Sequence, residues 1–330
     1  MNKYLRDNVF LGLLLLGVML FSLIFGRVDM SLADVWQGLT GGKDDSVSII
    51  VRELRLPRVI LGAVVGAALG LSGAALQGML RNPLADPGVI GVTASAAFGA
   101  VLAIHLGFII SFPLMISFFA MAGALVATAI LLFISARDAS VLMLILVGLG
   151  ISSLATALIS LVMNLSESPI SVRDMIMWML GSLENRTVSD LWFALPFIGF
   201  GWLLMLNVGQ ELNALSVGED TAKTMGVNIK QLKLRIVVGS AISVGAAVAV
   251  CGSIGFVGLI VPHMVRGLIC KEPGRLLLPS GLMGALLLTF ADILTRVPTP
   301  GTPLHIGVVM ALVGAPAFLF IVYKAREAMR

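Results

Sequence analysis

Long apolar stretches recur along the whole chain of 330 residues and are separated by short polar turns. Each stretch is roughly 17 to 25 residues long, which is the length a helix needs to cross the hydrocarbon core of a membrane. We predict ten spans, over residues 9–25, 58–80, 88–107, 112–135, 141–163, 190–206, 234–252, 255–270, 276–296 and 303–323. The stretches lack the period-two alternation of barrel strands, so the pattern predicts an all-α membrane protein.

Charge sets the expected orientation of these spans. Only 12% of residues are charged, and an even number of spans places both termini on one side. Most of the 22 Lys and Arg residues fall on the cytoplasmic side if the termini are cytoplasmic, as the positive-inside rule favours. The net charge of +4 therefore reflects topology, and the chain lacks the basic runs expected of a nucleic-acid-binding protein. We expect the first span to be retained, because it has no signal-peptide cleavage pattern.

The stretch RNPLADPG, residues 81–88, interrupts two apolar segments. Asn82-Pro83 and Asp86-Pro87 each match a helix N-cap followed by proline at the first helical position. We expect a cytoplasmic turn that begins a short helical turn and then the third span.

Small residues predict close helix packing. Gly62, Gly66 and Gly70 recur every four residues in the second span, as in small-xxx-small helix interfaces. The third and eighth spans are both short, rich in small residues and similarly placed in the two halves of the chain. Paired interrupted segments of this kind indicate an inverted repeat.

The fifth span carries a stripe of small and polar residues with a spacing of four. Its members are Gly148, Ser152, Thr156, Ser160 and Asn164. The stripe could line a translocation pathway. Alternatively, each hydroxyl could bond to the carbonyl four residues earlier in its own helix, which is common for Ser and Thr.

Basic residues cluster on the predicted outer side, against the topological bias. Arg52, Arg55 and Arg58 lie together in the stretch VRELRLPR, and they could be snorkelling side chains just before a span. Asp292 and Arg296 lie four residues apart near the end of the ninth span. An intramembrane carboxylate is a candidate functional group, although an i,i+4 ion pair is the simpler account.

The longest polar loop on the predicted cytoplasmic side spans residues 207–233. It has the pattern of two short helices joined by glycines, which would fit a groove on a partner protein. Three apolar residues are expected to share one helix face: Leu215, Ala222 and Met225. A turn is expected at Gly218, Glu219 and Asp220, and a second turn at Gly226 ends the segment. A helix lying on lipid headgroups is the alternative.

The chain carries little reactive chemistry of its own. It has no phosphate-binding GxxxxGK[ST] loop, and its histidines, His105, His263 and His305, are too scattered for a metal site. Cys251 and Cys270 lie in or beside apolar segments, where we expect them to act as small apolar residues. We expect a single transmembrane domain over residues 1–330, with no catalytic residue, metal or cofactor in this chain.

Several motifs together resemble the FecCD-type family of permeases, the membrane subunits of type II ATP-binding cassette (ABC) importers for iron-siderophore complexes, haem and vitamin B12. They follow the family's order and cover most of the chain: RLPR at 55–58, GAALGLSGAALQGMLRNPLADPGVIG at 66–91, WMLGSL at 178–183, LSVGEDTAKTMG at 215–226, GSIGFVGLIVPHMVR at 252–266, ADILTR at 291–296 and GAPAFL at 314–319.

The resemblance implies a homodimeric permease in the inner membrane of a bacterium, with two ATP-binding subunits and a substrate-binding protein as partners. ATP and Mg would then bind the partner subunits, and this chain would not be an enzyme. The expected cargo is an iron chelate, either a siderophore complex or haem, with vitamin B12 as the alternative. An ion-coupled secondary transporter is a rival from another class, but it would need acidic residues in mid-span, and every Asp and Glu lies in a loop or at a span end.

The resemblance also assigns roles to particular segments. It implies that residues 212–226 form coupling helices that contact the ATP-binding subunits, and that Arg55, Arg58 and Arg296 meet acidic residues of the binding protein. It places the fifth span and Trp178 along the path and its outer gate, and the turn at 136–141 near the inner gate. The family's Glu-Leu-Pro before the last span is replaced here by Pro303, Leu304 and His305, which leaves the shape of that outer loop open. We expect residues 82–88 to lie close to the ATP-binding subunit.

Overall fold

The computed structural model describes residues 3–26, 28, 30–41, 46–108, 112–135, 141–297 and 304–328, and these residues form helices and turns with no strand. The helices are α1 (Lys3–Ile24), α2 (Leu32–Thr40), α3 (Ser46–Ile49), α4 (Leu56–Leu80), α5 (Val92–His105), α7 (Leu114–Ser135), α8 (Val141–Leu165), α9 (Pro169–Met179), α10 (Val188–Leu204), α11 (Val208–Val217), α12 (Glu219–Thr224), α13 (Ile229–Cys251), α14 (Val257–Leu268), α15 (Pro273–Thr295) and α16 (Ile306–Ala328). A π-helical turn η1 (Ile50–Arg55) precedes α4, and a 3-10 turn η2 (Pro87–Ile90) precedes α5.

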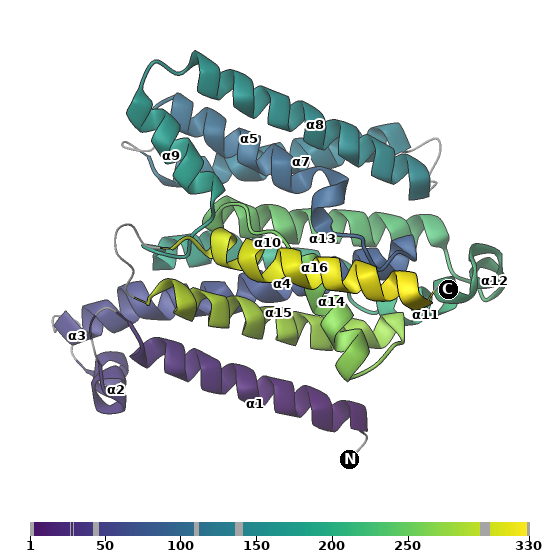
Figure 1. Cartoon of the computed structure of the whole chain (residues 1–330), viewed down its shortest axis with the longest axis horizontal. Helices are drawn as coiled ribbons and strands as arrows, with labels where there is room; N and C mark the ends of the chain where they lie inside the picture. The colour runs from purple at the N-terminus through teal and green to yellow at the C-terminus, as the bar shows by residue number, and fades with distance from the viewer. Residues whose placement is uncertain are drawn as a thin grey trace.

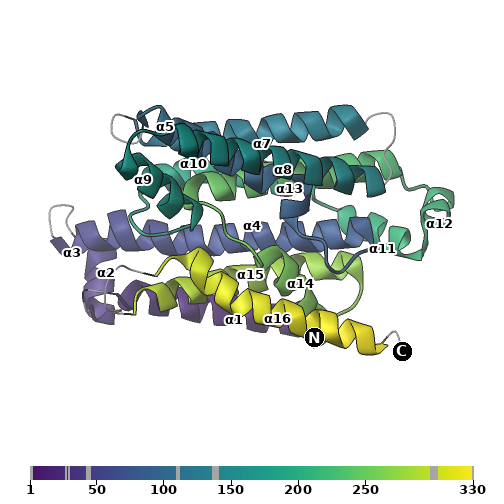
Figure 2. The same ribbon diagram turned by 45° about the horizontal axis from the view of Figure 1, so that its top comes forward.

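The long helices run roughly side by side along the longest axis of the molecule (Figure 1). Helices α4 and α13 are mostly buried in the middle of the bundle, whereas α1 and α8 are mostly exposed at opposite margins (Figures 1 and 2). An apolar surface on marginal helices is what a bundle surrounded by lipid tails requires. Because the described residues form only helices and turns, the all-helical prediction is confirmed.

Each of the ten predicted spans coincides with one helix, but the helices differ in length. Within the described residues, six helices are long and apolar enough to cross a membrane, and α10 with α11 forms a seventh candidate bent by 50°. Helices α5, α14 and α16 are apolar but shorter. A count of six or seven apolar spans is thus supported directly.

The third and eighth spans are shorter than predicted because each begins after non-helical backbone. Asp86 and Pro87 start the 3-10 turn η2, and Gly91, with φ of +82°, ends it before α5 begins at Val92. Gly252, with φ of +76°, ends α13, and a helix resumes only at Val257. Glycine adopts this left-handed backbone without steric cost.

The glycine-rich face of the second span packs as predicted, mainly against α15. A methyl group at Gly66 would collide with the backbone of Gly284, and one at Gly70 would collide with the carbonyl of Ser280. The two helix backbones are in direct contact, which the absence of a Cβ permits.

The two ends of the bundle carry different elements. Helices α11 and α12 lie at one end, together with the first turn of α1 and the last turns of α16 (Figures 1 and 2). Helices α2, α3 and α9 lie at the opposite end. Both candidate docking regions are therefore at the ends of the bundle, and the helices between them join the two.

Candidate functional site

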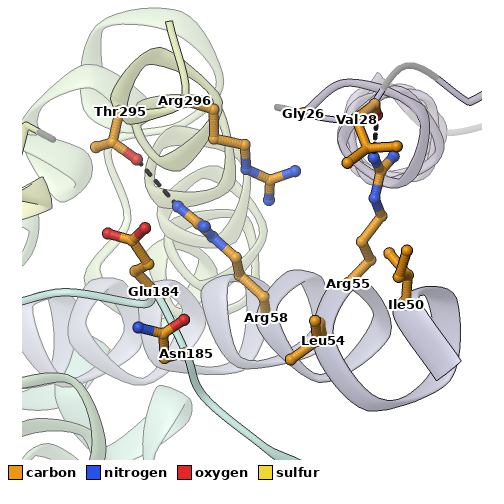
Figure 3. Close-up of a pocket in the computed structure, with 10 residues that line it drawn as sticks. All are labelled: Gly26, Val28, Ile50, Leu54, Arg55, Arg58, Glu184, Asn185, Thr295 and Arg296. Carbon is orange, nitrogen blue, oxygen red and sulfur yellow. Dashed lines mark hydrogen bonds between the residues drawn. The ribbon is translucent and has the colours of Figure 1, made fainter. Parts of the chain in front are cut away.

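Arg55, Arg58 and Arg296 come together in the structure. They line one cavity of about 260 Å³ at the bundle end that carries α2, α3 and α9, with Glu184, Asn185 and Thr295 also in the wall (Figure 3). Arg55 and Arg58 come from η1 and the first turn of α4, and Arg296 follows the last residue of α15. Pro57 has no N–H to donate to a preceding carbonyl, and the wider π-helical turn before it accommodates that missing bond.

Arg58 and Arg296 share one carboxylate. Arg58 donates from Nε and Nη2 to Asp292 Oδ1 at 3.0 and 2.8 Å, and Arg296 donates from Nη2 to Asp292 Oδ2 at 2.6 Å. Asp292 is only 2% exposed, so a full charge there requires such partners. The simpler account of Asp292 and Arg296, an i,i+4 ion pair, is confirmed, and Arg58 is a second partner that the sequence spacing did not reveal.

Arg55 and Arg296 also cap the end of α1. Arg55 Nη1 donates to the carbonyls of Leu23 and Ile24, both at 2.6 Å, and Arg296 Nη1 donates to the carbonyl of Ser22 at 2.6 Å. Arg55 extends toward Val28, to whose carbonyl it also donates (Figure 3). The last carbonyls of a helix have no partner within the helix, and cations there are stabilised by the helix dipole. At 8% exposure, Arg55 is buried in protein, so it is not a snorkelling side chain.

The predicted coupling segment forms two short helices with a sharp break between them. Gly218, with φ of +146°, separates α11 from α12, and Gly226, with φ of +86°, follows α12. Leu215 and Ala222 are fully buried against the rest of the bundle. The positions of both glycine turns agree with the sequence prediction.

Two ion pairs fasten this helical hairpin to the start of α13. Lys233 Nζ lies 2.9 Å from Glu219 Oε1, and Arg235 Nη1 lies 3.3 Å from Glu211 Oε1. Lys233 is 6% exposed and does not reach lipid headgroups, whereas Lys223 and Lys230, the other two basic residues that favoured the headgroup alternative, are exposed. The hairpin thus has a fixed position at this end of the bundle.

The outer face of the hairpin differs from the predicted one. Met225 does not share the face of Leu215 and Ala222, because it is 66% exposed while they are buried. Val217, which sequence reasoning missed, is 70% exposed. Asp220 is almost fully exposed beside Lys223, whose Nζ lies 3.1 Å from its Oδ1. Val217 lies two positions from buried Leu215, so helical spacing alone could have placed it on the opposite side.

The turn at 81–88 follows the last residue of α4, at the end of the bundle that carries the α11–α12 hairpin. Asp86 caps η2 by accepting from Gly88 N–H at 2.8 Å, with Pro87 at the first helical position, as predicted. Asn82 does not start a helix, because its Oδ1 accepts from Leu84 N–H in a local turn, and Asn82 and Pro83 are exposed. Burial raises the pKa of the Asp86 carboxyl above its ordinary value, and the Gly88 hydrogen bond opposes this.

The polar stripe of α8 bonds partly within its own helix and partly to η2. Thr156 and Ser160 donate to the carbonyls four residues earlier, at 2.9 and 3.0 Å, which confirms the local bonding. Ser152 instead lies 3.5 Å from the carbonyl of Gly88, and Gly148 packs directly on the backbone of η2. Asn164 is exposed. The pathway role of these residues stays a prediction.

Trp178 lies at the end of α9, where three glycines allow backbones to meet. Its carbonyl contacts Gly252 and accepts from Gly181 N–H at 3.1 Å, and Gly307 N–H donates to the carbonyl of Leu180 at 3.1 Å. The end of α9 is therefore joined to the break between α13 and α14 and to the first turn of α16.

Two predicted features fall wholly or partly outside the described residues. The inner-gate turn is covered only at Val141, since residues 136–140 are not described, and Pro303 is likewise not described. His305 is half-buried, and its carbonyl accepts from the N–H groups of Val308 and Val309 at the start of α16. Within the described ranges, no group of three or more His, Cys, Asp or Glu residues could hold a metal ion.

The fold and these sites define a multi-pass helical membrane protein whose two ends carry different polar elements. The chain belongs to the FecCD transport family, whose model matches residues 13–324. Members are transmembrane permease subunits of ABC importers, so this chain is not itself an enzyme. The recognition of this family from sequence motifs is confirmed.

Individual relatives resemble the chain over most of its length. The hemin transport system permease protein HmuU of Yersinia pestis is 36% identical, covering 99% of each chain. The cobalamin import system permease protein BtuC of Halobacterium salinarum is 39% identical, covering 85% of this chain and 75% of its own. A solved structure described as an inward-facing ABC transporter of the metal-chelate type is 33% identical, with a TM-score of 0.86 over 97% of this chain and 99% of the other.

Proposed function

We propose that this chain is the permease subunit of an ATP-driven importer that brings an iron chelate, a siderophore complex or haem, across the inner membrane of a bacterium. Two copies would enclose the path as a homodimer of ten-span subunits with cytoplasmic termini. The observation that carries the proposal is the α11–α12 hairpin, which is fixed by ion pairs and presents apolar residues outward in a chain of the FecCD family.

The hairpin is the surface on which we expect the ATP-binding subunit to dock. Val217 and Met225 are large, exposed apolar residues of the hairpin, which lies at the end of the bundle opposite the arginine cavity. Their burial in a cleft of the partner would stabilise the complex, while Leu215 and Ala222 hold the hairpin on the bundle. The ATP-binding subunits would bind ATP and Mg and close on each other. The hairpin would pass this movement to the membrane helices of this chain.

Co-purification tests this docking surface. The double variant Val217→Glu with Met225→Glu should lower the amount of ATP-binding subunit recovered with the permease by about ten-fold or more, because two charges would be desolvated in an apolar contact. Lys230→Glu, an exposed position in the first turn of α13, is the control and should leave recovery unchanged. Equal recovery with the double variant would refute the assignment.

At the other end, we expect the substrate-binding protein to dock over the arginine cavity. The buried group of Arg58, Arg296 and Asp292 carries one excess positive charge. Arg55 adds another in the same wall and Glu184 offsets one, so the three arginines less the two carboxylates leave one net positive charge. Such a field would attract an acidic side chain and speed association, more strongly at low salt. Arg55 and Arg296 also hold α1, so reversing all three charges would disturb the fold together with docking.

Arg58 therefore offers the cleaner test. Arg58→Gln leaves the Arg296 pair with Asp292 in place, and the dissociation constant for the binding protein should rise about ten-fold at low salt and less at high salt. Arg52→Gln is the matched control, since Arg52 lies six residues earlier and donates to the carbonyls of Leu39 and Gly41. An unchanged constant for Arg58→Gln at low salt would remove Arg58 from the docking surface.

The relatives guide the expected cargo. HmuU is named for hemin and the similar solved structure is described as of the metal-chelate type, which supports an iron chelate. The BtuC relative keeps a corrinoid cargo as the alternative. We expect the path to lie along α8 and Trp178 and to make few strong contacts with the cargo, because a tight site would hold it.

Asp292 is the buried carboxylate that a secondary transporter could use, but its partners make it unsuitable for carrying an ion. Asp292 is buried near a span end, and both of its oxygens already accept from guanidinium groups. A carboxylate held by two arginines is a poor carrier for a cation, since cation binding must displace both. The ABC importer therefore remains the function that these residues support best.

A further inference from the structure

Gln77 is a buried polar side chain in an apolar part of α4. It is 2% exposed, and its amide nitrogen donates to the carbonyls of Ala85 and Leu259, both at 3.1 Å, with Gly258 O slightly farther at 3.4 Å. Its amide oxygen accepts from Arg266 Nη2 at 2.7 Å. We propose that Gln77 is a positioning residue that couples the α11–α12 hairpin to helix α8, through the turn at 81–88. This inference rests on the proposed function.

The hairpin contacts α4 directly beside Gln77. A Cβ at the adjacent Gly78 would lie 3.3 Å from Leu212 Cδ2, so the α11 side chain packs on the α4 backbone at that point. Leu212 is fully buried. A movement of α11 on docking or closure of a partner must therefore displace either Leu212 or the last turn of α4, because packed interiors leave no room between them.

On its other side, Gln77 holds the turn that leads to α8. Ala85, whose carbonyl it binds, is followed by Asp86 and Pro87, which begin η2. The backbone of η2 contacts Gly148 so closely that a methyl group at Gly148 would collide with Val89 O. Ser152 adds a contact of 3.5 Å to Gly88 O. The order of contacts is thus hairpin, end of α4, turn, η2 and α8.

The start of α14 is part of the same junction. Gly258 lies between α4 and the turn, because a Cβ there would be 2.6 Å from Pro87 Cδ and its carbonyl lies against Gly73. Gln77 binds this first turn, and Arg266 returns from the last turn of α14 to the same amide. Two interrupted segments, 81–91 and 252–256, are therefore tied to α4 near one side chain.

Glutamine suits this position because one side chain must both donate and accept. Its NH2 group donates to the backbone carbonyls, and its oxygen accepts a hydrogen bond from Arg266. A carboxylate of the same shape could accept from Arg266 but could not donate to Ala85 O. An aliphatic side chain could do neither, and would leave buried carbonyls without a partner.

The test is the ratio of cargo transported to ATP hydrolysed, measured in proteoliposomes with the complete transporter and its binding protein. We expect Gln77→Leu and Gln77→Glu to lower this ratio by about ten-fold, in the range of measured coupling free energies, while the ATP-binding subunit still co-purifies. Ser72→Ala is the control on the same helix: Ser72 is fully buried, its hydroxyl has no hydrogen-bond partner in the described chain, and the ratio should be unchanged.

Gln77→Glu decides the matter if Gln77→Leu fails to assemble, since it preserves the side-chain volume and the acceptor for Arg266. A wild-type ratio in Gln77→Glu would overturn the inference, and so would a proportional loss of transport and hydrolysis at constant ratio, which indicates a purely structural role. If the unaltered transporter hydrolyses ATP but moves none of the chelates tested, the proposed function fails first and the inference falls with it.

Discussion

Asp292 binds two guanidinium groups while being almost fully buried, and this single carboxylate fixes three helices at the end of the bundle that carries α2, α3 and α9. Arg58 comes from α4, Arg296 follows α15, and Arg296 also binds α1 through Ser22 O. A buried charge cluster of this kind is tolerated only when each charge has partners. The same arginines are therefore both a structural clamp and the positive wall of the proposed docking cavity.

Replacement of this carboxylate separates the structural role from docking. Asp292→Asn would leave Arg58 and Arg296 facing each other without a counter-charge, and should cost about 3 kcal/mol or more of stability. Thermal unfolding in mild detergent measures this, with exposed Glu53→Gln as the control. An unfolding midpoint equal to that of the wild type would show that the cluster does not hold α1, α4 and α15 together.

At the scale of helices, close backbone contact between α4 and α15 organises the centre of the molecule. The glycine spacing in the sequence predicts this face, because small residues at intervals of four admit a second backbone. It does not predict the partner helix, since Gly284 and Ser280 lie more than two hundred positions later.

Other features escape the sequence for physical reasons. The prediction that Met225 shares a face with Leu215 is wrong, because Gly218 breaks the chain between α11 and α12 and no single helical face joins the two residues. Helical spacing places Val217 away from buried Leu215 only once α11 is known to continue to Val217. Asp86-Pro87 was correctly predicted as a cap, because that interaction is local, whereas Gln77 could not be recognised, because its partners Leu259 and Arg266 are distant in sequence.

The contact of α4 with α15 gives a prediction at this scale. Gly66→Ala should destabilise the protein by about 1–3 kcal/mol, because the added methyl group collides with the Gly284 backbone. Gly281→Ala on α15 is the matched control, as the nearest atom to its added methyl group is 3.9 Å away. Detergent unfolding midpoints compare the two, and similar midpoints would mean that the helices separate at little cost.

For the whole molecule, the two candidate docking regions lie at opposite ends of a helical bundle. The arginine cavity and α9 are at one end, and the hairpin and the turn at 81–88 are at the other. The α4 helix runs between them, with Arg58 in its first turn and Gln77 in its last. This bipolar arrangement suits a protein that receives cargo on one side of a membrane and energy from the other.

Uptake into proteoliposomes tests the central claim most directly. The permease, its ATP-binding subunit and its binding protein are reconstituted, and radiolabelled iron-siderophore, haem and cobalamin are supplied in parallel. We predict concentrative uptake of an iron chelate that requires both ATP and the binding protein, and uptake of cobalamin alone would favour the alternative cargo. Uptake that proceeds without ATP and follows an imposed proton or sodium gradient would contradict the account.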